Sequence, residues 1–274
     1  MALPLFVRAT LARAYPRVIG LWREPSWMLQ ETLLPLLSVS AFVFVYRAML
    51  HGPSPFEGFV LLGGAMTAFW LNVLWAMGAQ LYWERDGGNL ELYIVSPVSM
   101  MAILAGMALG GIVMTMVRAV VILAIGSFLF GVHFGHPETN WWQVAAVFVL
   151  TLVALYGLGM CFASAFLMWG REAWHTVALL QEPVYFLGGI NYPVRSLGVG
   201  VATVAAALPV TLGMDALRQL LFADPQITLP LISVEWEMAA LAVMGALYLW
   251  FARKLLAYLE RRAREEGRLT VRGH

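Results

Sequence analysis

Few residues in this 274-residue sequence could carry out chemistry, and the first to consider is its single lysine, Lys254. A phosphate-binding loop needs a lysine directly after a glycine-rich turn, where the ammonium group reaches the nucleotide phosphates. Lys254 lies instead in an Ala-Arg-Lys-Leu stretch. We therefore expect that the chain binds no nucleotide through a loop of this kind.

Nucleophilic catalysis also lacks its usual partners. Hydroxyl and thiol side chains such as Ser38, Ser40, Ser164 and Cys161 lie in apolar stretches without a histidine nearby in the sequence. A serine or cysteine nucleophile is weak until a neighbouring base activates it. The zinc-hydrolase motif His-Glu-x-x-His does not occur. We predict that the chain is not an enzyme and has no catalytic residue.

One short segment combines residue types that bind metals: His133, His136 and Glu138. The His-x-x-His spacing brings two imidazoles together only in a helix, and Gly135 and Pro137 favour a loop. We interpret the segment as a solvated turn and predict no metal site.

The composition excludes a soluble protein. Hydrophobic residues make up 61% of the sequence, charged residues only 12%, and the mean hydropathy is +0.77. A soluble domain has about a quarter of its residues charged, so most of this surface must face lipid. We therefore expect membrane lipid around the chain and no nucleic-acid partner. We also expect no removable signal peptide, because the first residues carry four arginines instead of a short apolar run with a cleavage site.

Six apolar segments are candidate transmembrane helices, because a bilayer core of roughly 30 Å requires about 20 apolar residues in a helix. Five segments are long enough: 27–50, 57–83, 99–131, 141–169 and 234–252. The sixth, 173–190, is shorter and contains Glu182-Pro183, which neighbouring helices can accommodate. We predict an all-α multi-pass membrane protein in which residues 1–274 form one transmembrane domain.

Two further segments do not fit simple spans. Residues 1–26 mix apolar positions with arginines, the pattern of a helix that lies on the membrane surface. Within 191–233, an apolar run from Leu197 to Leu208 is too short to cross and is ended by Pro209. A crossing there would also leave the basic tail, 253–274, outside. We predict a re-entrant hairpin on the outer side, between the fifth and sixth spans.

Basic residues gather on one side of the predicted bundle, which assigns that side to the cytoplasm. It receives the N-terminal segment, the 84–98 loop, the 170–172 turn with Arg171, and the tail 253–274. Three arginines fall on the opposite side: Arg47, Arg195 and Arg218. We expect a protein of the cell (inner or plasma) membrane with both termini in the cytoplasm.

The 84–98 loop is more elaborate than a connection between two helices requires. Four charges, Glu84, Arg85, Asp86 and Glu91, lie around a Gly87-Gly88 break. Glycine permits a sharp turn, and Asn89 is a favourable N-cap for a short helix. We expect Leu90, Leu92 and Ile94 to offer an apolar anchor on that helix, which Pro97 ends.

This loop resembles that of the type 2 ATP-binding-cassette (ABC) exporter permeases. Members typically carry Glu-basic-x-x-Gly-Thr-Leu-Glu-x-Leu-x-x-(Ser/Thr)-Pro between the second and third spans. The sequence matches at Glu84, Arg85, Gly88, Leu90, Glu91, Leu92, Ser96 and Pro97. It departs from the pattern with Asn89, where threonine is usual. A second set of matches follows Pro183: Gly188-Gly189, Tyr192-Pro193, Leu208-Pro209 and Asp215-Ala216-Leu217-Arg218.

The resemblance implies a permease that pairs with a second permease copy, giving a homodimer, and with two separate ATPase subunits. ATP and Mg²⁺ would bind to those subunits, and this chain would hold no cofactor. Residues 84–97 would be the coupling loop that docks on the ATPase, together with Arg171 and Glu172. The outer gate or re-entrant element would include Tyr192, Pro193, Pro209, Asp215 and Arg218.

Polar residues inside the predicted spans mark a candidate pathway, because unpaired amides are costly against lipid. These residues are Asn72, Gln80, Gln181, Glu182 and Tyr185. We expect Arg118 and Glu182 to avoid lipid and leave open whether they pair. Gly106-x-x-x-Gly110 suits close helix packing either within one subunit or between two.

The leading hypothesis is an exporter of hydrophobic or amphipathic small molecules or lipids that works by alternating access. A polysaccharide or glycolipid exporter of the same family is the second. An ion-coupled transporter or channel without an ATPase is the alternative from another class. Its intramembrane charges would be limited to Arg118, Glu182 and Glu31.

Overall fold

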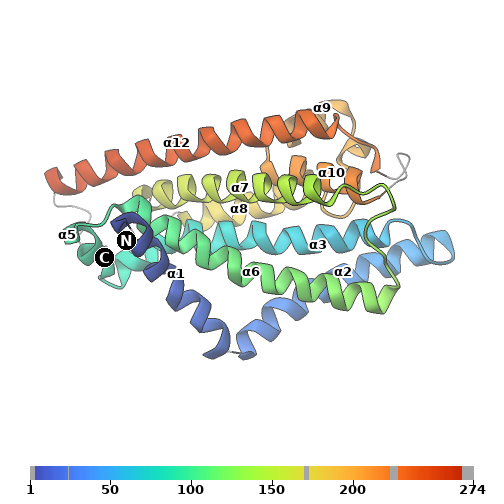
Figure 1. The fold of residues 1–274 in the computed structure, drawn as a ribbon, viewed down its shortest axis with the longest axis horizontal. Coiled ribbons are helices and arrows are strands. Elements are labelled where there is room, and N and C mark those ends of the chain that lie inside the picture. Colours follow the sequence, from blue (N-terminus) through green and yellow to red (C-terminus); the bar gives the residue numbers. More distant parts are fainter. Residues whose placement is uncertain (1–3, 24, 170–172, 223–227, 267–274) are drawn as a thin grey trace.

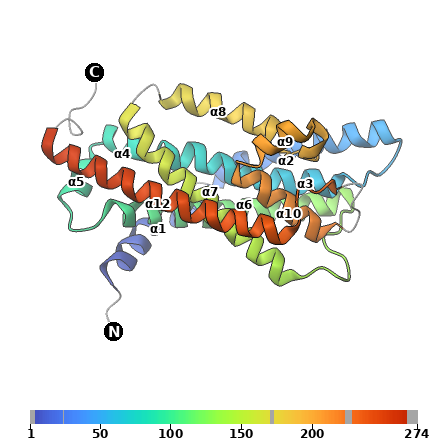
Figure 2. The ribbon, with the colours of Figure 1, turned by 90° about the horizontal axis from the view of Figure 1, so that it is seen from above.

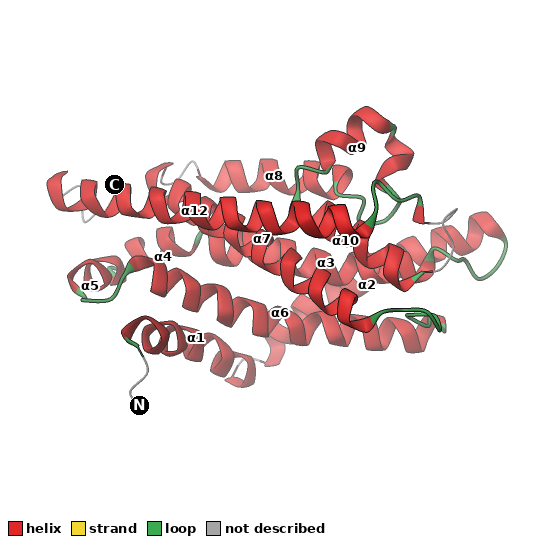
Figure 3. Ribbon diagram, turned by 45° about the horizontal axis from the view of Figure 1, so that its top comes forward, coloured by secondary structure: helices red, strands yellow, loops and turns green. Residues whose placement is uncertain are grey.

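The computed structural model describes residues 4–266, except 24, 170–172 and 223–227. Within these residues all regular secondary structure is helical (Figure 3). The prediction of an all-α membrane protein is confirmed.

Two helices form an elbow near the N-terminus (Figure 1). α1 (Leu5–Arg23) packs along α6 (Met100–Phe130), and α2 (Pro25–Leu50) leads away from α1 and packs against α6 further along. Glycines on α6 allow the close approach of α1, because a Cβ atom on Gly106 would lie 2.6 Å from the Thr10 carbonyl oxygen. The Gly106-x-x-x-Gly110 pattern therefore packs two helices of the same chain.

A long central rod carries most of the buried surface. It begins with α3 (Glu57–Leu71), continues through a π-helical segment, η1 (Asn72–Gly78), and ends with α4 (Gln80–Asp86). Of the candidate spans in the described residues, this rod is the most deeply buried. Wider π-helical turns often occur at functional sites, so η1 marks a candidate functional position within the rod.

The remaining helices surround this rod. In chain order they are α5 (Asn89–Val95), α7 (Trp141–Trp169), α8 (Ala173–Leu187), η3 (Val194–Leu197), α9 (Val199–Ala205), α10 (Pro209–Leu221) and α12 (Val234–Glu266). α7 lies against both η1 and α12, and α10 packs against both α7 and α12.

Five described helices are long and apolar enough to cross a membrane: Leu29–Leu50, Glu57–Asp86, Met100–Phe130, Trp141–Phe166 and Val234–Leu259. They correspond to the five long segments predicted. α8 is only 15 residues long, but it runs along the bundle beside the others (Figure 2). α9 and α10 are bent by 110° relative to each other, a geometry that fits either a broken span or a re-entrant hairpin. The hairpin therefore stays a prediction.

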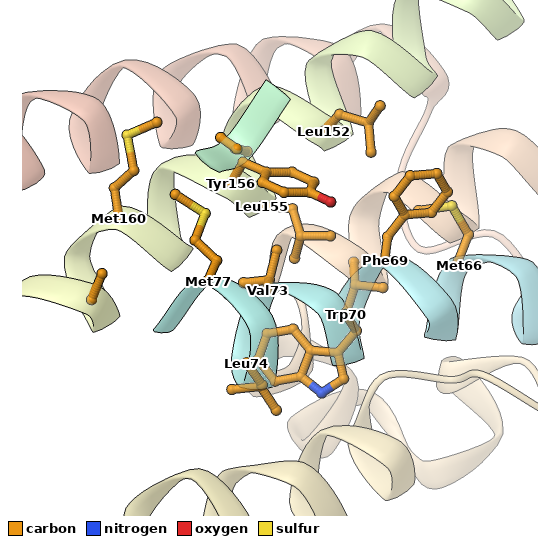
Figure 4. Packing of buried hydrophobic residues seen from close by; sticks show 14 of the residues in the cluster. Met66, Phe69, Trp70, Val73, Leu74, Met77, Leu152, Leu155, Tyr156 and Met160 are labelled. Carbon is orange, nitrogen blue, oxygen red and sulfur yellow. The ribbon is translucent and has the colours of Figure 1, made fainter. Parts of the chain in front are cut away.

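The main core lies between the central rod and α7. Met66, Phe69 and Val73 lie on the side of the rod that faces α7, whereas Trp70 and Leu74 extend from its other side (Figure 4). Leu152, Leu155, Tyr156 and Met160 approach from α7. Glycine makes this contact possible, because a Cβ atom on Gly159 would lie 2.9 Å from a methyl group of Val73.

The ends of the described chain lie on one side of the bundle. The start of α1 and the end of α12 are both at the end that carries α4 and α5 (Figure 1). The 131–140 connection and α9 lie at the opposite end. This agrees with an even number of crossings. The assignment of the α5 end to the cytoplasm remains a prediction from the arginine distribution.

Candidate functional site

Glu84 is the hub of the 84–98 loop. Its carboxylate forms an ion pair with Arg13 of α1 and accepts a hydrogen bond from Gln80 Nε2 at 2.8 Å. It also accepts hydrogen bonds from Asn89 Nδ2 at 2.9 Å and from the Tyr93 hydroxyl at 3.1 Å. The carboxylate thus joins α1, α4 and α5, and its side chain is buried.

The resemblance places Glu84 in the loop that docks on the ATPase, and its burial limits how it can act there. Glu84 faces inward with four donors, so it is not a surface charge that could orient a docking partner. Arg13 was not expected in this role. Arg13 and Arg17 are four residues apart and therefore share one face of a helix. This spacing could have indicated that both side chains point the same way.

The short helix α5 begins at Asn89, so its N-cap lies one residue before the predicted cap. Gly88 is the N-cap residue and has φ of 78°, in the left-handed region where glycine carries no Cβ penalty. Asn89 does not cap the helix, because its side-chain amide donates to Glu84 instead. Ser96 is extended after the last turn, so α5 ends before Pro97 as predicted.

The apolar residues of α5 divide between two faces. Leu90 is buried and Ile94 packs against the main core, so neither is an exposed anchor as the sequence suggested. Leu92 and Val95 are 67% and 86% exposed. Glu91, the residue before Leu92, is exposed as well. Asp86 and Gly87 are exposed at the preceding turn. Burial raises the pKa of the Tyr93 hydroxyl, which therefore stays protonated and donates to Glu84 at neutral pH.

The other residues assigned to docking are less well placed. Arg85 is half-buried, with its guanidinium 5.2 Å from the centre of the Tyr82 ring. Arg171 and Glu172 lie outside the described residues.

A cavity of about 770 Å³ lies among α1, α2, the central rod, α6 and α8. Three of the five predicted pathway residues line it: Asn72, Gln181 and Tyr185. Asn72 is the first residue of the π-helical segment and accepts a hydrogen bond from Tyr156 at 2.9 Å. Trp75, also in that segment, donates its indole N–H to Gln181 over 2.7 Å. The π-helical segment thus supplies polar groups to the cavity wall.

Charged side chains also line this cavity. Arg118 of α6 forms an ion pair with Glu31 of α2, and Arg17 of α1 contributes a second guanidinium. Arg118 is buried, as predicted, but its partner is Glu31. Glu182 is exposed and accepts a hydrogen bond from Gln181 at 3.1 Å, so the considered pairing of Arg118 with Glu182 is wrong.

Hydrogen bonds connect the cavity to the loop. Arg17 donates to the carbonyl oxygens of Met107 and Ala76 at 2.9 and 2.6 Å, and to Gln80 Oε1 at 2.5 Å. Gln80 in turn donates to Glu84. Gln80 therefore does not line the cavity but bridges Arg17 and Glu84. Burial lowers the pKa of Arg17 to about 10, which leaves its guanidinium charged at neutral pH.

At the opposite end of the bundle, Arg218 of α10 is buried and donates hydrogen bonds to two backbone segments. It donates to the carbonyl oxygens of Gly189 at 2.5 Å, Ile190 at 2.7 Å and Phe59 at 3.0 Å. Its guanidinium carbon lies 3.2 Å from the centre of the Phe59 ring. The turn after α8 is thereby joined to the start of the central rod.

The other residues assigned to the outer element lie on α10 and in the segment between α8 and η3. Asp215 accepts hydrogen bonds from the Leu231 backbone N–H at 2.8 Å and from Gln219 at 3.0 Å. Pro209 occupies the first turn of α10, and the Tyr192 hydroxyl donates to the Phe186 carbonyl. Pro193 precedes η3 and is buried. Asp215, Arg218 and Tyr192 thus form hydrogen bonds that hold the polypeptide chain at this end of the bundle.

The fold and the site define a multi-pass helical membrane protein with a polar cavity among its helices and a compact loop at one end. The sequence profile of the family described as ABC-2 type transporter matches residues 13–222. The chain belongs to this family and is a transmembrane subunit of an ABC transporter.

Two curated relatives are similar to this chain. Both are named "Probable multidrug ABC transporter permease YbhR", one from Escherichia coli strain K12 and one from Escherichia coli O157:H7. Each is 24% identical to the chain over 174 residues, which cover 63% of this chain and 46% of the relative. The aligned region thus spans about half the length of these relatives.

Proposed function

We propose that the chain is the permease subunit of an ATP-driven exporter, with its α5 end in the cytoplasm. A separate ATPase subunit, present in two copies with ATP and Mg²⁺, would dock on α5 and power a dimer of permeases. The observation that carries the proposal is the hydrogen-bonded connection from Arg17 through Gln80 to Glu84. It links the cavity wall to the loop that the family uses for docking.

In this mechanism, closure of the ATPases pushes on the exposed face of α5. Because Glu84 ties α5 to α1 and α4, the push moves these elements as a unit. Packed helices switch between discrete arrangements more readily than they deform. Displacement of α1 carries Arg17, and so alters the wall of the cavity. The cavity would open alternately to the two sides of the membrane.

The proposed substrates are hydrophobic or amphipathic small molecules, or lipids. The cavity supports this class because it combines apolar side chains, such as Leu34 and Met114, with the polar groups above. The word "multidrug" in the names of the two relatives points in the same direction. A polysaccharide or glycolipid substrate is the second candidate, and a compound panel in reconstituted vesicles would separate the two.

Copurification tests the docking step. The tagged chain, purified from its native host, should bring an ATPase subunit with it. Leu92→Asp combined with Val95→Asp should remove that subunit, because charges on the exposed face prevent burial against a partner. Leu5→Asp is the matched control: Leu5 is an exposed apolar residue at the same end, outside α5. Equal recovery of the ATPase with both variants contradicts docking on α5. Consistent absence from the unaltered chain supports an ion-coupled transporter instead.

A further inference from the structure

A second hollow lies on the other side of the molecule from the cavity, between α7 and α12. It is a groove of about 660 Å³ that shares no lining residue with the cavity. Figure 2 shows α7 and α12 crossing, so that they diverge toward the end of the bundle that carries α4 and α5. The groove lies in this half, because its lining residues come from the later part of both helices.

The groove is apolar along its walls and has one charge. Phe162 and Phe251 are typical of its lining, and among the described residues that line the groove Lys254 alone is charged. The Lys254 ammonium lies 5.8 Å from the centre of the Trp250 ring. Tryptophan and lysine near the end of a span mark the boundary between hydrocarbon and headgroups. An apolar slot therefore ends close to a cation at headgroup depth.

The surroundings of the groove identify its occupant. α12 is a candidate span whose surface is mostly exposed, so the groove opens to lipid and an acyl chain can enter it. The cytoplasmic leaflet is rich in anionic lipids, which attract lysine and arginine near its surface. With the α5 end in the cytoplasm, as proposed above, Lys254 lies in that leaflet. Its charge complements a lipid phosphate that has no cationic group of its own to offset it.

We propose that the groove between α7 and α12 is a binding site for an anionic phospholipid. One acyl chain would lie along Phe162 and Phe251, and the lipid phosphate would pair with Lys254. The site depends on the orientation of the chain but not on which substrate is transported. It is a regulatory or structural lipid site, separate from the cavity.

The chain provides its own reporter for this site. Cys161 is the single cysteine and lines the groove, where its thiol is 3.2 Å from the Tyr248 carbonyl oxygen. A bound acyl chain would shield this thiol from a small maleimide. The rate of Cys161 alkylation therefore measures occupancy of the groove without any labelling substitution.

The test compares the full-length protein in nanodiscs of phosphatidylcholine alone and of an equimolar mixture with phosphatidylglycerol. For the unaltered chain, phosphatidylglycerol should slow alkylation by N-ethylmaleimide about fivefold, the effect of one lysine near an anionic surface. Lys254→Gln should abolish the difference between the two lipids, and Lys254→Arg should keep it. Arg253→Gln removes the same charge from the exposed neighbouring residue outside the groove, so it should keep the slower rate.

Two results would overturn the site. Equal rates in both nanodiscs for the unaltered chain would show only general lipid contact. If Lys254→Gln and Arg253→Gln reduced the slowing by phosphatidylglycerol equally, the slowing would be only an effect of surface charge. Lipids retained after detergent extraction give a second readout, in which Lys254→Gln should retain less phosphatidylglycerol than Arg253→Gln. None of these results depends on an ATPase, so they are separable from the test of the exporter.

Discussion

The side-chain amide of Gln80 donates a hydrogen bond to the carboxylate of Glu84 over 2.8 Å, one turn further along α4. The same amide accepts a hydrogen bond from Arg17 through its oxygen. A glutamine suits this position because it is a donor and an acceptor at once. The hydrogen-bonded link between Arg17 and Glu84 therefore runs through this side chain, and Gln80 is a positioning residue.

Glu84→Gln should destabilise the folded chain, and Glu91→Gln should not. Loss of the Glu84 charge leaves Arg13 without its partner and removes acceptors for Asn89 and Tyr93. We expect a loss of about 1–3 kcal/mol, the cost of unsatisfied buried polar groups. Glu91 is exposed, so Glu91→Gln should change stability by less than about 0.5 kcal/mol. Denaturation midpoints of the purified proteins measure both.

The same pair of variants separates stability from docking. If Glu91 faces the ATPase, Glu91→Gln should reduce copurification of that subunit while the denaturation midpoint stays unchanged. A Glu84→Gln protein as stable as the unaltered chain would show that the hub does not hold α1, α4 and α5 together.

Gln80→Leu should uncouple the two ends of the connection. Leucine keeps the approximate size of glutamine but neither donates nor accepts. ATPase activity of the reconstituted complex should persist, whereas its stimulation by transported compounds should fall. Gln143→Leu is the control, because Gln143 lies at the start of α7 and belongs neither to the cavity lining nor to the 84–98 loop. Unchanged stimulation in Gln80→Leu would argue that the coupling passes through the backbone alone.

Arg218→Met should be among the most damaging single substitutions. It leaves three carbonyl oxygens without their donor in a buried place, for which we expect about 3 kcal/mol or more. Arg218→Lys keeps the charge but cannot reach three acceptors with the geometry of a guanidinium, so it should recover only part of the stability. Arg195 is exposed and donates to the Pro230 carbonyl at 2.7 Å. Arg195→Met should cost less than about 0.5 kcal/mol. Similar midpoints for the Arg218 and Arg195 variants would contradict this role.

Much of the fold could be predicted from the sequence because the bilayer imposes a length on each apolar segment. The five long spans and the α5 helix ending before Pro97 follow directly from local composition. The cavity residues Asn72, Gln181 and Tyr185 were predictable for a related reason: amides and hydroxyls inside a span need partners.

Partners, by contrast, depend on tertiary packing that no local pattern contains. Arg118 pairs with Glu31, 87 positions away in the chain, because the α1–α2 elbow brings α2 beside α6. Glu84 turns inward because α1 lies over it with Arg13. Asn89 binds Glu84 rather than capping α5, since Gly88 already supplies the turn. In each case a charged or amide group interacts with a partner from a distant or neighbouring element, and not in the way that its local sequence suggested.

The α9–α10 bend permits a direct test of the re-entrant hairpin. In a Cys161→Ala background, single cysteines near Arg195 and near Asp224 should both react with an impermeant reagent added from outside. A broken span would expose only one of them. Asp224 lies outside the described residues, so its accessibility comes from the labelling alone. A cysteine at Glu91 should react only after the membrane is permeabilised, which tests the orientation at the same time.

The Arg118–Glu31 pair should respond unequally to the loss of each partner. Side-chain exposure is 9% for Arg118 and 31% for Glu31. Glu31→Gln leaves a buried guanidinium that cannot readily lose its proton, so we expect a loss of about 3 kcal/mol. Arg118→Met leaves a carboxylate that water reaches and that can take up a proton, so the loss should be smaller, about 1 kcal/mol. The double variant should be more stable than Glu31→Gln alone, with a coupling energy of about 1–2 kcal/mol. Glu182→Gln, at an exposed position, is the control and should show no coupling to Arg118→Met. Additive effects of the Glu31 and Arg118 substitutions on the denaturation midpoint would show that the two side chains do not interact.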